Sequence, residues 1–311
     1  MIFVAGSANL DFVVQAPHIP APGETVLGRD FKTFPGGKGA NQAIACARAG
    51  GVATEMLLAL GYDAFAAPIE ASLKSADVRL HTIRVSGHPT GTAFICVSDD
   101  AENAITVAPG ANSCLREEHL PELKGISHLL LQLEIPLETV AAYARSARAQ
   151  GVKVVLNAAP MQTLPPELLS LIDVLVVNEG ELGSLSDSQT DIVHSLATIS
   201  VPWVVVTLGD QGCVARIDGR FYSQPAFPVN PVDSTAAGDT FCGVLVAALS
   251  RNLGVQDALR HASAASALAC TRLGAQQSIP ALAEVGDFLA CAPEIREERH
   301  AALRRYCGMR D

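Results

Sequence analysis

Short apolar runs separated by helix-like stretches constrain this chain more than any other feature. Five runs are rich in β-branched residues and apolar at consecutive positions: residues 2–5, 128–133, 152–156, 174–177 and 203–207. Such runs are typical of strands buried on both faces of a parallel sheet. Helical patterns occupy residues 40–49, 137–150, 190–199 and 240–250. This alternation predicts βαβ units in an α/β fold with a doubly wound sheet.

Two segments depart from the alternation. Residues 12–33 alternate polar and apolar side chains and contain Pro17, Pro20 and Pro22, and residues 92–107 read as two strands joined by an acidic turn at 98–103. Both segments predict an exposed antiparallel flap beside the main sheet. Because no linker, repeat or shift in composition divides the chain, residues 1–311 are expected to form a single domain.

The net charge and the cysteines exclude some classes of function and of cellular location for this protein. The chain has 22 Lys and Arg against 32 Asp and Glu, a formal charge of −10, which argues against nucleic-acid binding. Eight cysteines without a C-x-x-C pair indicate buried free thiols in a reducing compartment. The N-terminus lacks the features of a signal peptide, and no run of about 18 apolar residues predicts a membrane span. We therefore expect a cytoplasmic protein that binds neither membranes nor nucleic acids.

The block DSTAAGDTFCG at residues 233–243 is the strongest candidate for chemistry. Ala236, Ala237 and Gly238 precede a helical pattern, and the free N–H groups at a helix start form an anion site that small residues leave accessible. Asp239 at the mouth of that site could take a proton from an attacking hydroxyl. Helix capping explains Asp239 about equally well on its own, and the small residues before it favour catalysis.

Two blocks near the N-terminus could bind a ligand. FPGGKGAN at residues 34–41 is a glycine-rich turn before a helix, but it fits neither the Walker nor the Rossmann pattern, and tight turns alone would explain it about half the time. In GSANLD at residues 6–11, Asn9 and Asp11 lie two apart on an extended segment, so they point the same way and suit adjacent sugar hydroxyls. A turn with side-chain hydrogen bonds is the better explanation of that block in isolation.

Two further blocks directly follow predicted strands. NEGE at residues 178–181 could hold a hydrated Mg²⁺, or equally could begin a helix with a cap and favourable acids. TLGDQG at residues 207–212 could let a nucleotide lie against its glycines, although a hairpin turn is the better local explanation. None of the five blocks decides the function alone. Together they supply a base, an anion site, a metal site, a nucleotide loop and a pair of hydroxyl ligands, which indicates phosphoryl transfer to a polyol.

These blocks, with PGETV at 22–26, LLQLEIPLE at 130–138 and TRLGAQQSIP at 271–280, resemble the ribokinase-like (PfkB) carbohydrate kinases over nearly the whole chain. The glycine block and DSTAAGD are that family's two signatures, and both occur in order at the usual separation. The resemblance implies a Rossmann-like three-layer domain with a mostly parallel central sheet. It also implies a small β-sheet lid from residues of approximately 12–34 and 92–107, and a homodimer formed through the lid.

The resemblance also assigns roles to individual residues. Asp239 would be the catalytic base, with Ala236, Ala237 and Gly238 as the anion hole. The sugar would contact Asn9, Asp11, Gly37, Lys38, Gly39, Ala40, Asn41, Glu134 and Asp239. The ATP site would be formed by Asn178, Thr207, Leu208, Gly209, Asp210, Gln211, Gly212, Gly238 and Ser263. Mg²⁺ would be held by Glu181, directly or through water. A monovalent cation, K⁺, would be held by Asp233, Thr235, Ala269, Arg272, Gly274 and Ser278.

The expected activity is ATP-dependent phosphorylation of the primary hydroxyl of a pentose, with D-ribose giving ribose 5-phosphate. Kinases of 2-deoxyribose, a ketohexose or a nucleoside are alternatives within the class. A sugar-binding regulator without catalysis is a remote alternative, which the intact Asp239 disfavours. Two features depart from the family pattern: Ser263 stands where the family carries Asn or His, and the tail from about Cys291 extends past the core pattern with no role assigned to it.

Overall fold

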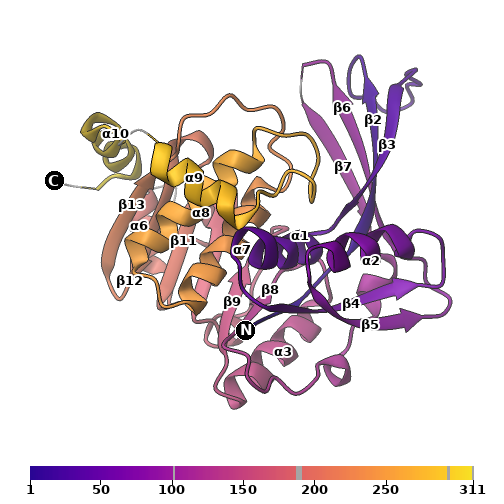
Figure 1. Ribbon diagram of the computed structural model, residues 1–311, viewed down its shortest axis with the longest axis horizontal. Coiled ribbons are helices and arrows are strands. Elements are labelled where there is room, and N and C mark those ends of the chain that lie inside the picture. Colours follow the sequence, from indigo (N-terminus) through magenta and orange to yellow (C-terminus); the bar gives the residue numbers. More distant parts are fainter. Residues whose placement is uncertain (101, 187–190, 293–294, 310–311) are drawn as a thin grey trace.

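A nine-stranded sheet forms the centre of the molecule (Figure 1). The computed structural model describes residues 1–100, 102–186, 191–292 and 295–309. In spatial order the strands are β13 (Arg220–Pro225), β12 (Gly212–Ile217), β11 (Trp203–Thr207), β10 (Val174–Asn178), β9 (Lys153–Asn157), β8 (His128–Leu131), β1 (Ile2–Ala5), β4 (Thr54–Gly61) and β5 (Arg79–Val85). The strands from β11 to β5 pair in parallel, whereas β12 and β13 are antiparallel.

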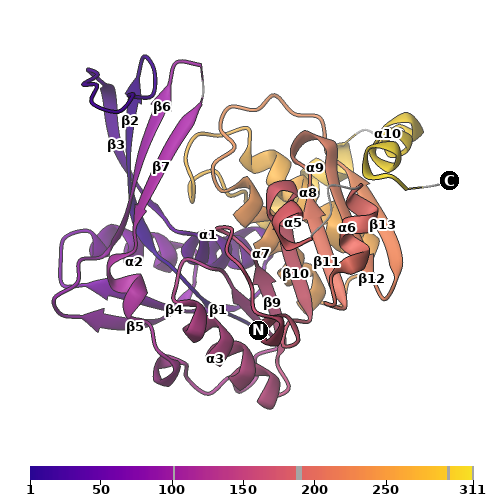
Figure 2. The same cartoon turned by 180° about the vertical axis from the view of Figure 1, so that it is seen from behind.

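Helices cover both faces of this sheet, as the two opposite views show (Figures 1 and 2). One face carries α1 (Lys38–Ile44), α2 (Ala66–Ser75), α7 (Ala237–Ser250), α8 (Val255–Ala269) and α9 (Leu282–Cys291). The other face carries α3 (Leu137–Ala149), α5 (Glu179–Leu185), α6 (Ile192–Thr198) and, beside β13, α10 (Glu297–Cys307). Shorter elements are α4 (Pro166–Leu169), a π-helical turn (Ala45–Ala49) and 3₁₀ turns at Gly110–Cys114, Glu117–His119 and Gly209–Gln211.

The apolar strands explain this three-layer arrangement. Along β1, Ile2 and Val4 pack into the core cluster on one face while Phe3 and Ala5 pack into the cluster on the other. Consecutive side chains of a strand point to opposite faces, so a run of consecutive apolar residues needs cover on both sides. The predicted three-layer α/β fold is confirmed. None of the helices in the described ranges has both the length and the apolar character needed to cross a bilayer.

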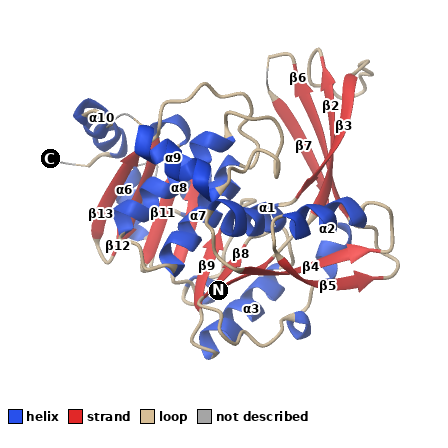
Figure 3. Cartoon of the chain, in the orientation of Figure 1, coloured by secondary structure: helices blue, strands red, loops and turns tan. Residues whose placement is uncertain are grey.

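A second, four-stranded sheet projects from the main body as the lid (Figures 1 and 3). Its order is β3 (Arg29–Gly36), β2 (Asn9–Ala16), β6 (Gly91–Ser98) and β7 (Asn103–Ala108). The prediction of an antiparallel flap is wrong for the central pair, because β2 and β6 run parallel. These two strands follow β1 and β5, which point the same way in the main sheet, so they leave it side by side in one direction. Only β3 and β7 run back.

The boundaries of several predicted elements shift. The strand expected at 128–133 ends at Leu131, where its pairing with β1 and β9 stops, and the buried side chain of Gln132 donates to Gln42. The helix expected from residue 240 begins at Ala237, and the one expected at 40–49 starts at Lys38 and becomes π-helical from Ala45. For the helix expected at 190–199 the structure gives Ile192–Thr198, and residue 190 lies outside the described residues. Strands β4, β5, β12 and β13 were not anticipated.

Helix α7 lies so close to the start of α1 and its π-helical turn that Gly243 has no space for a side chain. A Cβ there would lie 2.7 Å from the carbonyl oxygen of Gln42 and 2.9 Å from the amide nitrogen of Cys46. Alanine is otherwise favoured over glycine in a helix by about 0.5–1 kcal/mol. We expect Gly243→Ala to lower the free energy of unfolding in urea by about 1–3 kcal/mol, as overpacking does.

The matched control for this prediction is Gly286→Ala in α9, where an added Cβ meets nothing within 4 Å. It should stabilise the protein by about 0.4–1 kcal/mol, because it only restricts the unfolded chain. Equal effects of the two substitutions would contradict tight packing of α7 against the first helix.

Candidate active site

A cavity of about 230 Å³ opens where the carboxyl ends of β9, β10 and β11 meet the first turn of α7. Its walls are formed by Lys38, Asn157, Ala159, Val176, Val177, Asn178, Glu181, Thr207, Ser234, Ala236, Gly238, Asp239 and Cys242. The carboxyl edge of a parallel sheet is where ligands bind in open α/β folds. Four of the blocks found in the sequence, around residues 38, 178, 207 and 233, therefore meet here.

Two amide groups from α1 fix the carboxylate of Asp239. Asn41 donates to its Oδ2 and Gln42 to its Oδ1, both at 2.9 Å. Gln42 also donates to Asn157 and accepts from Gln132, so a buried amide network stands behind the carboxylate. The residue that caps α7 is Ala236, without a side-chain hydrogen bond. Asp239 is therefore not the helix cap, and its carboxylate is held rigidly and 7% exposed at the cavity.

The first turn of α7 is shaped as an anion site. Ala236 has left-handed backbone angles, φ 59° and ψ 10°, which for a residue other than glycine cost about 1–2 kcal/mol. The amide of Ala237 donates to Ser234, while those of Gly238 and Asp239 stand in the first turn, where a helix supplies no carbonyl partner. Gly238 has nothing within 4 Å of where a Cβ would lie. Two N–H groups at the positive end of the helix can therefore face an anion.

Lys38 lines the same cavity as the first turn of α7. Its side chain lines the cavity together with Glu181 and Asp239, and the charge of Asp239, followed by those of Glu134 and Glu181, raises the pKa of its ammonium group. The sequence analysis had grouped Lys38 with the sugar contacts. In the structure its ammonium group lies in the cavity beside the first turn of α7, where a cation could also hold a phosphate.

Asn9 and Asp11 extend from the same face of β2, where the lid joins the body. Asp11 is 8% exposed and packs directly against Gly36, where a Cβ would lie 2.0 Å from a carboxylate oxygen. Burial, and then the charges of Glu134 and Asp239, raise the pKa of Asp11 to about 7. Asn41 Oδ1 is buried without a hydrogen-bond partner in the described structure. Such acceptors are suited to the hydroxyl groups of a ligand.

The glycine-rich block forms the tight entry to α1. Gly37 has φ 89°, and a Cβ on it would lie 2.8 Å from the amide nitrogen of Asn9. Ser7 accepts from the amides of Gly39 and Ala40, through its hydroxyl and its carbonyl respectively. These two amides are thus already paired within the protein, and the side chain of Ala40 lies in the core rather than facing a ligand.

Glu134 links this turn to the strand edge. Its Oε2 accepts from the Ser7 hydroxyl and, at 3.0 Å, from the amide of Lys38. The carboxylate therefore satisfies one of the free amides at the start of α1, which favours negative charge there. Its negative charge raises the pKa of both Asp11 and Lys38.

A second cavity of about 580 Å³ adjoins the first and shares Thr207, Ser234 and Gly238 with it. Gly209, Asp210, Gly212 and Ser263 line it, as expected for the nucleotide loop. Leu208 packs in the core and Gln211 bonds to Asp210, so these two are not among its lining residues. The remaining walls come from Ala226, Phe227, Pro228, Val229, Pro231, Ala237, Phe241, Ser266, Ala267, Cys270 and Arg299. Residues 207–212 also form the turn between antiparallel β11 and β12, so the hairpin explanation is correct as well.

Asn178 and Glu181 form a reciprocal capping box at the start of α5. The side chain of Asn178 accepts from the amide of Glu181, and the carboxylate of Glu181 accepts from the amide of Asn178, each at 2.8 Å. The capping explanation of this block is therefore correct. Glu181 nevertheless lines the smaller cavity, and burial raises the pKa of its carboxyl group. One carboxylate with water ligands is a common way to hold Mg²⁺ next to phosphates.

The loops expected to bind a monovalent cation are tied together by Asp233. Its Oδ1 accepts from the amide of Thr235 at 2.8 Å and its Oδ2 from that of Gly274 at 2.9 Å. Arg272 pairs with Glu284, and the hydroxyl of Ser278 donates to Ala275. Ala269 accepts from the amide of Arg272. No group of three His, Cys, Asp or Glu suited to a metal occurs among the described residues, so backbone carbonyls would have to supply most ligands.

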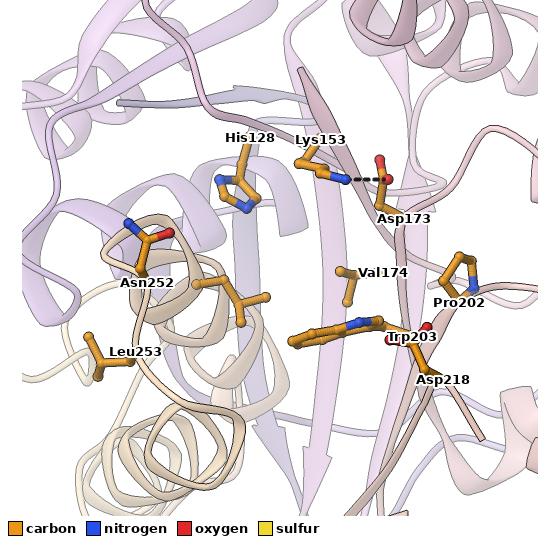
Figure 4. A pocket seen from close by; sticks show the side chains of 10 residues that line it. His128, Lys153, Asp173, Val174, Pro202, Trp203, Asp218, Asn252 and Leu253 are labelled. Atoms are coloured by element: carbon orange, nitrogen blue, oxygen red, sulfur yellow. Dashed lines mark hydrogen bonds and ion pairs between the residues drawn. The ribbon is translucent and has the colours of Figure 1, made fainter. Parts of the chain in front are cut away.

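A larger cavity, about 630 Å³, lies at the opposite edge of the sheet (Figure 4). His128, Lys153, Val174 and Trp203, the first residues of β8, β9, β10 and β11, line it. The ion pair from Lys153 to Asp173, 3.2 Å long, spans one of its walls. This cavity lies at the amino ends of the strands, whereas ligands of open α/β folds bind at the carboxyl ends, so its size does not make it the active site.

Comparison with known proteins identifies the family of this chain. The family model described as "pfkB family carbohydrate kinase" matches residues 1–282. The chain belongs to the PfkB family of carbohydrate kinases. It is thus a phosphotransferase with an alcohol group as acceptor, and the expected membership and enzyme class are confirmed.

The relatives of this kinase include ribokinases. It is 38% identical to the ribokinase of Haemophilus influenzae over 298 residues, which cover 92% of this chain and 97% of the relative. The crystal structure of Thermotoga maritima ribokinase superposes with a TM-score of 0.86 at 36% identity, covering 93% of this chain and 99% of the other. Arabidopsis thaliana ribokinase, solved with ribose and ATP, gives a TM-score of 0.84 at 33% identity, covering 93% of this chain and 98% of the other.

Several residues of the kinase that shape the site were missed by the sequence analysis. Gln42 holds the second oxygen of Asp239, and Gln132 and Asn157 bond to Gln42. Asn112 donates to Asn9 Oδ1 at 2.8 Å and thereby orients it, and Ser7 holds the glycine turn. The only signal for Gln42 was its position next to Asn41. Ser7 and Gln132 lie inside the blocks at 6–11 and 130–138, and Asn112 and Asn157 lie outside any block. The role of all four depends on contacts across the fold, which the blocks do not show.

The raised pKa of Asp11 yields a prediction for the kinase without ligands. Between pH 4 and pH 7 Asp11 ionises in the unfolded chain while it still holds its proton in the folded protein, so it lowers stability as the pH rises through this window. Asp11→Asn should therefore raise the thermal unfolding midpoint relative to the native protein, with a gain that is small at pH 4 and largest near pH 8.

Asp30→Asn is the control, since Asp30 lies exposed on the adjacent strand β3 with a backbone (φ 52°) that Asn also adopts. Its effect should vary little with pH. A gain from Asp11→Asn that is constant from pH 4 to pH 8 would contradict the raised pKa.

Proposed function

We propose that this kinase transfers the γ-phosphoryl group of ATP to the primary hydroxyl of D-ribose, giving ribose 5-phosphate. The observation that carries the proposal is the carboxylate of Asp239, held by two amides at the positive end of α7 in a small polar cavity that adjoins a second one of about 580 Å³. The ribokinases among its relatives, one of them solved with ribose and ATP, support ribose as the acceptor.

In the proposed reaction Asp239 accepts the proton of the sugar's primary hydroxyl as that oxygen attacks the γ-phosphorus. The new oxygen–phosphorus bond forms as the bond to the β–γ bridging oxygen breaks, and ADP leaves with that oxygen. The amides of Gly238 and Asp239 and the ammonium group of Lys38 face the transferring group and stabilise its negative charge. Such fixed donors need no reorganisation during the transfer.

Sugar recognition is proposed for Asn9, Asp11 and Asn41. The unpaired Oδ1 of Asn41 would accept from a hydroxyl beside the one that Asp239 deprotonates. The buried carboxyl of Asp11 would accept from two hydroxyls in its ionised form, and those hydrogen bonds would lower its pKa again. Because β2 carries Asn9 and Asp11, a movement of the lid toward the body would bring them onto the sugar and exclude water.

Two cations are proposed to assist. Glu181 would hold hydrated Mg²⁺, which when bound shields the charge of the ATP phosphates, and its Oε1 is left for that task because Oε2 binds the amide of Asn178. K⁺ would lie beside Asp233, with carbonyl oxygens of the 269–278 segment as further ligands. Backbone oxygens suit such a cation, and Asp233 already draws the two loops together.

A homodimer formed through the lid is proposed from its exposed apolar surface. Leu27, Phe31, Phe94, Ile105 and Val107 are exposed on the lid and its connecting segment, and the rings of Phe31 and Phe94 both stack on Phe12. Phe31 and Phe94 lie on the face of the lid that carries Phe12, whereas Ile105 and Val107 flank Thr106, the partner of Phe94, and point to the other face. Exposed apolar side chains of this kind mark an interaction site, and a second copy of the lid would cover them. The eight free thiols, all within the described residues, support a reducing cytoplasm as the compartment.

Replacing the base tests the mechanism. Asp239→Asn should bind ATP and sugar nearly as the native enzyme does, because the amide has the size and shape of the carboxylate and its oxygen can still accept from α1. Its kcat should fall by at least about 10²-fold, as expected when a positioned base is lost. The measurement is ADP release with ribose, with both ligands titrated by calorimetry.

Asp257→Asn provides the control for Asp239→Asn, because Asp257 occupies the first turn of the next helix, α8, outside both cavities. It changes the same charge at an equivalent position and should leave kcat unaltered. Near-native turnover of Asp239→Asn would remove Asp239 as the base.

A comparison of acceptors tests the substrate. ADP release is measured with ribose, 2-deoxyribose, fructose and adenosine in parallel, with K⁺ and Mg²⁺ present. We expect the highest kcat/KM for ribose, because Asn9, Asp11 and Asn41 offer acceptors for several adjacent hydroxyls. A preference for one of the other three would replace ribose as the substrate while leaving the kinase mechanism in place. Binding of sugar and ATP without ADP release from any acceptor would favour the non-catalytic regulator.

A further inference from the structure

The C-terminal helix α10 lies outside the part of the chain that the family pattern describes. The family model ends at residue 282, and α10 spans Glu297–Cys307. Ribokinases matched over 97–99% of their own lengths cover only 92–93% of this chain, so the chain has residues that they do not account for. The helix therefore needs an explanation from its own contacts.

The contacts of α10 anchor it to the nucleotide half of the molecule. Leu303 and Cys307 are buried in the core cluster on the α3 face. The hydroxyl of Tyr306 donates to the carboxylate of Glu179 at 2.9 Å, and Glu179 is the first residue of α5, next to Asn178. Figure 1 shows α10 at the β13 edge of the sheet. The helix is thus a fixed part of the body beside the β11–β12 turn, and not a loose tail.

One side chain of α10 reaches the second cavity, the one of about 580 Å³ that the nucleotide loop lines. Arg299 lines that cavity, and its Nη1 donates to the carbonyl oxygen of Ala226 at 3.2 Å. Ala226 in turn donates its amide to Gln211 in the nucleotide loop. Thr207 and Gly238, which the second cavity shares with the smaller cavity around Asp239, line its other part. Arg299 therefore lies at the end that a nucleotide's base, rather than its terminal phosphate, would occupy.

We propose that α10 completes the nucleotide site and that Arg299 contacts the purine base of ATP, which makes it a residue that determines nucleotide affinity in this chain. The inference rests on the proposed function, because it requires ATP in the larger cavity. A guanidinium plane stacks on an aromatic face and donates to ring nitrogens, and both suit a purine. The same kind of contact already occurs at this cavity, because the guanidinium group of Arg260 lies over the ring of Phe227, which lines it, 5.4 Å from the ring centroid.

The test is titration calorimetry on the full chain without sugar, using Mg·ADP and Mg·tripolyphosphate as probes. Arg299→Ala should weaken Mg·ADP about tenfold, the scale of a desolvated cation–π contact, and leave tripolyphosphate unchanged because that probe has no base. In steady-state assays the KM for ATP should rise while the KM for the sugar stays constant. Arg299→Lys should recover little of the loss, since an ammonium group does not stack as a guanidinium does.

Arg305→Ala is the matched control, because Arg305 is exposed on the same helix and does not line the cavity. It should leave both probes unaffected. A chain ending at Ala292 removes the whole helix and should reproduce the weakening of Mg·ADP. Since that truncation also removes the buried Leu303 and Cys307 and could unfold the protein, Arg299→Ala decides the result.

The remaining outcomes are distinct. Unchanged Mg·ADP binding by Arg299→Ala would overturn the proposal, and equal weakening of Mg·ADP and tripolyphosphate would show that Arg299 acts on the phosphates or only through the position of α10, which also overturns it. Failure of the native protein to bind Mg·ADP would remove the proposed function itself. The native titration thus separates the two failures.

Discussion

The pair of hydrogen bonds from Asn41 and Gln42 to Asp239 is the interaction on which the rest of this site depends. It joins the first turns of α1 and α7, which are about two hundred residues apart in sequence. The two bonds fix both carboxylate oxygens, and Gly243 lets the helices approach closely enough for them to form. A carboxylate held in this way keeps its position relative to the amides of its own helix, so the proposed base and the proposed anion site cannot move apart.

The charges around that base explain why a kinase site needs cations. Asp11, Glu134, Glu181 and Asp239 influence one another or Lys38, and Lys38 is the one cationic side chain among the described residues that line the smaller cavity. Triphosphate brought into such surroundings would meet more repulsion than one ammonium group and a helix terminus offset. A divalent cation beside Glu181 resolves this, which is a physical reason for Mg²⁺ independent of the family.

Elements at both ends of the molecule contribute to the same site. The lid strand β2 begins at Asn9 and carries Asp11, and therefore couples the position of the lid to the sugar contacts. On the far side, α10 adds Arg299 to the wall of the nucleotide cavity although it follows all the recognisable blocks. The central sheet holds these distant pieces in register, and the loops at its carboxyl edge carry the chemistry.

The sequence by itself determined the layered fold and the main reactive groups. Consecutive apolar residues such as Ile2–Ala5 require cover on both faces, and the small residues before Asp239 leave a helix terminus open, so these features follow from local pattern. The tertiary structure decided the rest: the parallel pairing of β2 and β6, the place of Lys38 in one cavity with Asp239, the amide network of Gln42 and the position of Arg299 in the wall of the second cavity. Those depend on contacts between segments far apart in the chain, and no local pattern records which segments will meet.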